Sequence, residues 1–310
     1  MAPPVSVLVP LYRDEESVQP LLARLEPVLR ELGDGSELVL VDDGSPDRTG
    51  DVAVALARDY PHPVTVVQLA RNFGQHPAVF AGFEHCRGDV VVTMDSDLQY
   101  APEEIPRLVS ELSPEVPVVS GLRSERADPW PRRFVSRTLS RWLSRATGST
   151  LRDYGSMFRA YDRSVVAQLR RFRERRRFVP ALVGWLGVPV KEIPVRHEPR
   201  GPRGSRYRLG TLVDMSLDLI TGYATFPLRI LTVLGFAGAL LGLAATLSLV
   251  TYRIVSGTGP SGLVSAFALV FFLLGIQLFI TGLIGEYVGR VYIEAKDRPY
   301  FIVREVTRNR

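Results

Sequence analysis

The sequence predicts an α/β domain with a parallel, Rossmann-like sheet, followed by two membrane-spanning helices. The sheet is predicted because short β-branched runs alternate with helical stretches, a pattern typical of parallel strands joined by helices. The expected strands are residues 5–10, 37–41, 64–69, 89–94 and 117–120. The membrane helices are predicted because residues 230–250 and 263–285 form runs of 21 and 23 residues without a charge, and about 20 apolar residues cross a bilayer.

Composition excludes several other classes of protein. The chain has 310 residues, of which 46% are hydrophobic, so it can form one sizeable domain and a smaller second part. Its only cysteine, Cys86, cannot form an internal disulfide, which fits a reducing cytosol. The histidines lack the spacing of a zinc site, and the Gly-x-Gly-x-x-Gly fingerprint of nicotinamide or flavin enzymes is missing. No basic and apolar leader precedes the first strand, so we expect no signal peptide.

Basic residues indicate the orientation of the two apolar runs. Those that flank the outer ends are Arg203, Arg206, Arg208, Arg229, Arg290, Lys296, Arg298 and Arg304. The loop between the runs contains only Arg253, so the positive-inside rule predicts that both ends are cytoplasmic and that residues 256–262 lie outside. Two buried core helices are the alternative, which the length of the runs disfavours. The expected layout is a cytoplasmic domain over residues 1–208, a juxtamembrane helix over 209–229, membrane helices over about 230–252 and 263–285, and a cytoplasmic tail over 286–310.

Acidic residues follow three of the expected strands: Asp14 after the first, Asp42 and Asp43 after the second, and Asp95 and Asp97 after the fourth. In open α/β sheets, ligands bind at the carboxyl ends of the strands. We therefore expect these acids to converge at one edge. Carboxylates suit Mg²⁺ or Mn²⁺ that also takes phosphate oxygens, so Asp95 and Asp97 are the expected metal ligands. Alone, this turn would be interpreted as the cap of a helix beginning near Pro102; three such turns favour a ligand site.

Residues 132–146 predict a basic amphipathic helix, because arginines recur every fourth residue and apolar side chains fall on the opposite face. We expect this helix to lie in the bilayer interface, and packing on the sheet is the alternative. Residues 170–177 contain six arginines. A nucleic-acid patch is conceivable there, but a solvated or lipid-facing helix end is favoured, and no nucleic-acid partner is expected.

Four ordered motifs resemble those of family 2 glycosyltransferases with the GT-A fold. They are residues 10–15 (PLYRDE), 42–49 (DDGSPDRT), 72–78 (NFGQHPA) and 95–99 (DSDLQ). The stretch 153–161 (DYGSMFRAY) and the two apolar runs resemble, within that family, the polyprenyl-phosphate glycosyltransferases. The resemblance extends over nearly the whole chain. The family usually has Asn and Glu where this chain has Arg13 and Asp14.

The resemblance implies transfer of a single sugar, with inversion, from a nucleotide sugar to a polyprenyl phosphate such as undecaprenyl phosphate. The donor is implied to be UDP-linked and to contact Pro10, Tyr12, Asp14, Asp42, Asp43, Gln99 and Arg206. The acceptor phosphate is implied to contact Arg123, Arg132 and Ser136. Asp95 and Asp97 are implied to hold Mg²⁺ or Mn²⁺ and to be catalytic together with Asp153. Contacts with membrane lipids, a plasma-membrane location and a homotetramer are also implied.

The implied acceptor affects the role of Asp153. A phosphate monoester has a second pKa near ~6 and is largely dianionic at neutral pH, so it has no proton to lose. We therefore expect Asp153 to orient Arg123, Arg159 or the metal shell.

Two alternative functions fit parts of the sequence. A processive polysaccharide synthase should have Gln-x-x-Arg-Trp, but Arg141 and Trp142 are preceded by Thr138 at the Gln position. A non-catalytic membrane scaffold would not need to retain Asp95, Asp97 and Gln99.

Overall fold

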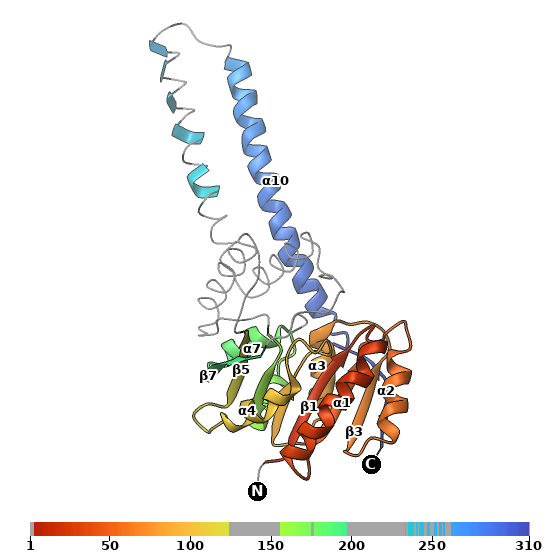
Figure 1. Ribbon diagram of the computed structural model, residues 1–310. Coiled ribbons are helices and arrows are strands. Elements are labelled where there is room, and N and C mark those ends of the chain that lie inside the picture. The colour runs from red at the N-terminus through yellow and green to blue at the C-terminus, as the bar shows by residue number, and fades with distance from the viewer. Residues whose placement is uncertain are drawn as a thin grey trace. The chain divides into compact units, whose positions relative to one another are not determined.

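The computed structural model describes residues 3–123, 156–174, 177–196 and 262–309, and parts of 233–257. The chain forms two compact units. The first combines Met1–Leu209 with Arg298–Arg310, and the second is Gly210–Asp297. The last residues of the chain thus return to the unit that contains the first ones, and both termini lie in it (Figure 1).

The first unit is built on an eight-stranded sheet with the order β7-β5-β6-β4-β1-β2-β3-β8. Its centre consists of the parallel strands β1 (Val5–Leu11), β2 (Glu37–Asp42), β3 (Val64–Leu69) and β4 (Val90–Thr93). Every residue of β2, β3 and β4 is buried, as expected for parallel strands covered on both faces. The predicted parallel α/β sheet is confirmed, and the four strands begin within one residue of their expected positions.

The other half of the sheet is mixed. β6 (Arg159–Asp162) lies between β4 and β5 (Val118–Arg123) and is antiparallel to both, whereas β7 (Val190–Val195) is parallel to β5. The sequence analysis anticipated β5 but neither β6 nor β7. The pairing of Thr93 with Arg159 brings residues from beyond position 155 to the end of β4.

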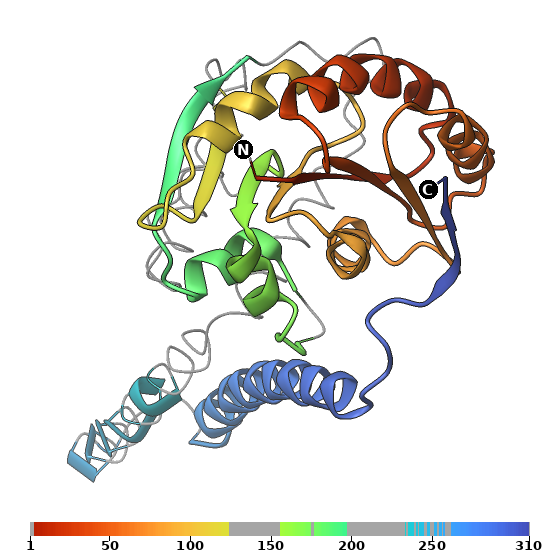
Figure 2. The ribbon, with the colours of Figure 1, turned by 90° about the horizontal axis from the view of Figure 1, so that it is seen from below.

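Helices cover both faces of the sheet (Figure 2). One face carries α1 (Glu15–Leu32), α2 (Thr49–Arg58) and α4 (Ile105–Ser110), and the other carries α3 (Gln75–His85) and α6 (Arg163–Leu169). Two further elements complete the described helices of this unit, namely η1 (Pro102–Glu104) and α7 (Val179–Trp185). The apolar residues of α1 recur at helical spacing and are buried against the sheet: Val18, Leu21, Leu22, Leu25, Val28, Leu29 and Leu32.

The last described strand of the chain is not among the strands that the sequence pattern predicts. β8 (Val303–Arg308) pairs with β3 in the antiparallel sense and forms one edge of the sheet. Asn309 secures its end. The Nδ2 group of this residue donates to the carbonyl oxygens of Ala57 at 2.9 Å, Tyr60 at 3.3 Å and His62 at 3.0 Å, and its Oδ1 accepts from the amide of Val64 at 2.8 Å.

The second unit contains α10 (Gly262–Ala295), a helix of 34 residues. At a rise of 1.5 Å per residue it is roughly 50 Å long, and it extends ten residues beyond the expected run. Within it, Phe272–Ala295 is long and apolar enough to cross a membrane, and no other helix among the described residues is. A shorter apolar helical segment, Gly235–Ala244, lies in the other run, which is described only in part.

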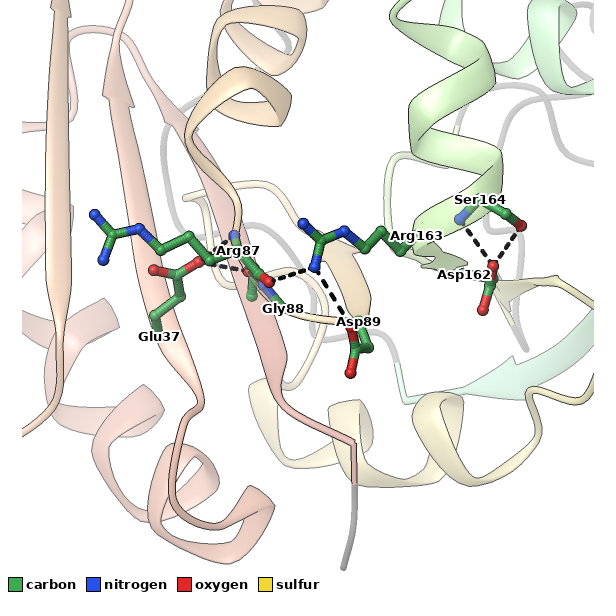
Figure 3. A network of polar contacts seen from close by, with 8 residues as sticks. Glu37, Arg87, Gly88, Asp89, Asp162, Arg163 and Ser164 are labelled. Carbon is green, nitrogen blue, oxygen red and sulfur yellow. Dashed lines mark hydrogen bonds and ion pairs between the residues drawn. The ribbon is translucent and has the colours of Figure 1, made fainter.

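A polar network joins the amino ends of β1, β2 and β4, opposite the edge with the strand-end acids (Figure 3). The buried carboxylate of Glu37 accepts from the hydroxyl of Ser6 at 2.7 Å and from the amide of Arg87 at 2.6 Å. Arg163 donates to the carbonyl oxygen of Arg87 at 3.1 Å. These contacts satisfy a buried charge with fixed donors, so Glu37 has a structural role.

Candidate active site

The register of the parallel strands brings three acidic turns together at the carboxyl ends of these strands. Leu11 at the end of β1 lies beside Asp42 at the end of β2, and Leu8 lies beside Thr93 at the end of β4. Asp14 follows β1, Asp42 and Asp43 lie at the end of β2, and Asp95 and Asp97 follow β4. The expected convergence is therefore present in the fold. The alternative, in which the Asp95 turn caps a helix, is not observed, because Ala101 precedes η1 and no side chain caps it.

Asp14 connects the first turn to the third. Its Oδ2 atom accepts from the hydroxyl of Ser96 at 2.6 Å and from the amide of Tyr12 at 3.0 Å. Its own amide donates to the hydroxyl of Thr49 at 2.9 Å. Arg13 has φ +56 between these contacts, in the left-handed region that tight turns use. Asp14 thus holds the turn of β1 against the turn of β4.

Asp42 and Asp43 are only 2% and 3% exposed. Asp43 accepts two backbone hydrogen bonds of 2.8 Å, one at Oδ1 from Phe73 and one at Oδ2 from Gly74. Asp42 accepts from the amide of Ser45 at 3.2 Å. Burial raises the pKa of Asp43 to about 6, despite its two backbone donors, and also raises the pKa of Asp42.

The turn after β4 presents the two acids expected to bind a metal. The side-chain amide of Gln75 donates to Oδ1 of Asp95 at 2.5 Å, and the amide of Gln99 donates to Oδ1 of Asp97 at 3.2 Å. Both carboxylates are partly exposed, unlike Asp42 and Asp43. Leu98 between Asp97 and Gln99 has φ +55.

These acids fit a cation that is shared with a substrate. Among the described residues, no group of three or more His, Cys, Asp or Glu side chains could form a closed metal site. Mg²⁺ commonly takes one or two protein carboxylates and completes its shell with phosphate oxygens and water. Asp95 and Asp97 are such a donor pair, so the residues present fit a divalent ion that binds together with a diphosphate.

The remaining expected site residues divide into two groups. Pro10 and Tyr12 lie at the end of β1, with the guanidinium of Arg13 5.5 Å from the centre of the Tyr12 ring. Arg123 is the last residue of β5. The others, Arg132, Ser136, Asp153 and Arg206, lie outside the described residues, as do the expected helices over 132–146 and 209–229.

Several site contacts were not anticipated. Gln75 and Ser96 lie within quoted motifs but had been given no role. Arg159 is fully buried and donates from Nε to the hydroxyl of Ser120 at 3.0 Å. Burial of the imidazole, together with the nearby charge of Arg159, lowers the pKa of His76 to about 4, so His76 is neutral at physiological pH. The motif of residues 72–78, which contains Gln75 and His76, was the sequence signal that could have pointed to these contacts.

Comparisons with known proteins identify the family of the chain. The family described as Glycosyl transferase family 2 matches residues 6–170. The undecaprenyl-phosphate 4-deoxy-4-formamido-L-arabinose transferase of Pseudomonas aeruginosa (strain LESB58) is 42% identical over 306 residues, which cover 98% of this chain and 90% of the relative. The protein of the same name from Edwardsiella ictaluri (strain 93-146) is 40% identical, with coverage of 98% and 94%.

Solved structures show the same fold. Glucosyl-3-phosphoglycerate synthase from Mycobacterium tuberculosis, in complex with Mn²⁺, UDP-glucose and phosphoglyceric acid, has a TM-score of 0.53 at 21% identity. The alignment covers 71% of this chain and 78% of that one. The family match spans more than half of the chain and the relatives align with nearly all of it, so the chain belongs to glycosyltransferase family 2 and has the GT-A fold.

Proposed function

We propose that the protein transfers one sugar, with inversion, from a UDP-linked donor to undecaprenyl phosphate at the cytoplasmic face of the plasma membrane. The observation that best supports this is the meeting of buried Asp42 and Asp43 with the partly exposed Asp95 and Asp97 at one sheet edge. Such an edge offers polar acceptors for a nucleoside beside a pair of metal ligands. The acceptor follows from the names of the relatives.

Each acidic turn has a distinct task in this proposal. Tyr12, Asp14 and Asp43 line the nucleoside pocket, whose shape is maintained by the contact of Asp14 with Ser96. Asp95 and Asp97 hold a divalent ion, which supplies neutralisation of the charge that develops on the departing diphosphate. Gln99 faces the donor sugar. The fixed backbone donors at Asp43 and Asp97 keep these side chains in place before the substrate arrives.

The acceptor needs positioning more than it needs a base. A phosphate monoester is largely dianionic at neutral pH because its second pKa is near ~6. Arg123, Arg132 and Ser136 would orient this dianion for attack on the sugar, which supplies the proximity part of the catalysis. Asp153 orients Arg123, Arg159 or the metal shell and does not remove a proton.

The position of β8 supports a two-helix hairpin in the membrane. The chain up to Leu209 and the chain after Arg298 belong to one folded unit, and β8 is hydrogen-bonded to β3. One sheet cannot lie on both sides of a membrane, so the intervening chain must cross an even number of times. If α10 spans the bilayer, residues 230–252 span it as well. The amphipathic stretch 132–146 would then lie in the cytoplasmic interface beside the acceptor phosphate, and assembly as a homotetramer is part of the same proposal.

The test is the mass of the lipid product. Purified protein in nanodiscs receives undecaprenyl phosphate, Mn²⁺ and a panel of UDP-sugars, and the extracted lipid is analysed by mass spectrometry. We expect an increase of one sugar residue with one member of the panel. Addition of many sugars would indicate a processive synthase instead. Donor binding without any transfer or hydrolysis across the panel would indicate a scaffold.

A further inference from the structure

The proposed function uses two backbone amides of the segment 72–75 but gives none of its side chains a role, although the segment contacts both Asp43 and Asp95. On its amino-terminal side, the amide of Ala70 donates to the carbonyl oxygen of Ile302 at 2.9 Å, which joins it to the chain just before β8. On its carboxyl side it continues into α3, whose residues Ala78, Val79, Phe80, Ala81, Gly82 and Phe83 are buried. Both ends of the segment are therefore anchored.

The two middle residues of the segment are bound to the buried acid Asp43. The amides of Phe73 and Gly74 donate to separate oxygens of this carboxylate. Gly74 has φ +106, a conformation that other residues adopt only with strain. Gly44 allows the turn after β2 to lie close to the backbone of Arg71, because a Cβ atom at this position would be only 2.3 Å from it.

The last residue of the segment, Gln75, reaches the turn that contains Asp95 and Asp97. Gln75 is the first residue of α3 and is exposed, and its Nε2 atom donates to Oδ1 of Asp95. An exposed side chain adds little to the packing of the core, so its removal should not unfold the domain. The turn that contains Asp95 is held from the other side by the hydrogen bond from Ser96 to Asp14.

We infer that Gln75 is a positioning residue for the metal-binding carboxylate. It donates to Oδ1 of Asp95, and it thereby favours one rotamer of the carboxylate that is proposed to bind the cation. Because the same segment is also bound to Asp43, it fixes the position of the proposed metal ligand relative to the proposed nucleoside pocket. This inference rests on the proposed function, since it takes Asp95 as a ligand. Outer hydrogen bonds of this kind orient metal-bound carboxylates in general.

The experiment measures the dissociation constant of Mn²⁺ by electron paramagnetic resonance on the full-length protein with saturating UDP. In Gln75→Ala we expect this constant to rise at least about 10-fold, the usual effect of losing an outer-shell partner. UDP binding without metal should stay unchanged. Gln19→Ala, an exposed glutamine on α1, is the matched control.

The outcomes separate this inference from the proposed function. If the wild-type protein and Gln75→Ala bind Mn²⁺ equally, the positioning role is wrong while the function stands. If the wild-type protein binds no Mn²⁺ in the presence of UDP, both the metal assignment and the positioning role are wrong. Turnover gives a second readout, because excess Mn²⁺ should restore the rate of Gln75→Ala toward that of wild type. A defect that excess Mn²⁺ leaves unchanged would contradict the inference.

Discussion

Carboxylates with similar burial have different roles at the two ends of the sheet. At the amino ends, Glu37 is enclosed by the hydroxyl of Ser6 and the amide of Arg87. At the carboxyl ends, Asp43 is equally buried, yet it adjoins the partly exposed turn of Asp95 and Asp97 through segment 72–75. The position of a residue along the strand therefore separates structural acids from candidate catalytic ones.

This distinction predicts the effect of replacing Glu37. In Glu37→Ala the hydroxyl of Ser6 and the amide of Arg87 lose a charged acceptor, so the free energy of unfolding should fall by about 1–3 kcal/mol. The KM for the nucleotide sugar should not change, because the site lies at the other end of the strands. Thermal unfolding and initial rates measure the two effects. An altered KM with unchanged stability would assign Glu37 to the site.

Asp43 predicts a pH dependence of donor binding. Its pKa in the folded chain is about 6, above the ordinary value of 3.8, so protonation favours the folded state. Its stabilising contribution is complete below pH 3.8 and is lost as the pH rises through 6. Donor binding should show the reverse trend if it uses the ionised acceptor. UDP-glucose, whose diphosphate does not titrate near pH 6, should bind about 10-fold more weakly at pH 5 than at pH 7.5.

Calorimetric titration with UDP-glucose at several pH values tests this prediction. In Asp43→Asn the affinity should be lower, and its change between pH 5 and 7.5 should disappear. An equal pH dependence in this variant would show that another group is responsible.

At the scale of elements, the sequence predicts the parts whose signals are local. The runs of Val and Leu in β1 to β4 indicate buried parallel strands whatever their neighbours are. β8 could not be predicted in this way, because half of its residues are charged and its partner residue Gln68 precedes Arg304 by 236 positions. The contact of Gln75 with Asp95 was missed for a related reason, since it depends on how the first residue of α3 lies against the turn after β4.

Asn309 should be a principal anchor of β8. In Asn309→Ala the strand loses three donated hydrogen bonds and one accepted hydrogen bond, so the free energy of unfolding should fall by about 1–3 kcal/mol. The exposed neighbour Arg308 is the matched control. Thermal unfolding of both variants compares them. Equal, small changes in the two would show that the contacts of Asn309 contribute little.

At the scale of the whole molecule, the sequence predicts a two-part chain, and the structure adds that the chain returns to its first unit. Four of the expected site residues, Arg132, Ser136, Asp153 and Arg206, lie outside the described residues. Only their resemblance to family motifs links them to the phosphate.

Because residues Arg298–Arg310 belong to the same folded unit as Met1–Leu209, both should lie on the same side of the membrane, and this predicts a labelling pattern. In a Cys86→Ala background, Thr258→Cys should react with an impermeant thiol reagent applied to intact cells, because the loop is expected to be external. Glu305→Cys on β8 should react only after the cells are permeabilised. Labelling of Glu305→Cys in intact cells would overturn the cytoplasmic location of the sheet.

The central claim is metal-assisted transfer of a single sugar at the edge containing Asp95 and Asp97. Its most direct test is the rate at which a radiolabelled sugar moves from the UDP donor to undecaprenyl phosphate, compared between wild type, Asp97→Asn and the control Glu37→Ala. Loss of a metal ligand removes transition-state stabilisation of several kcal/mol, or about 100-fold in rate and more. We predict this loss for Asp97→Asn and for wild type with excess chelator, and none for folded Glu37→Ala. Full transfer by Asp97→Asn, or by the chelated enzyme, would contradict the account.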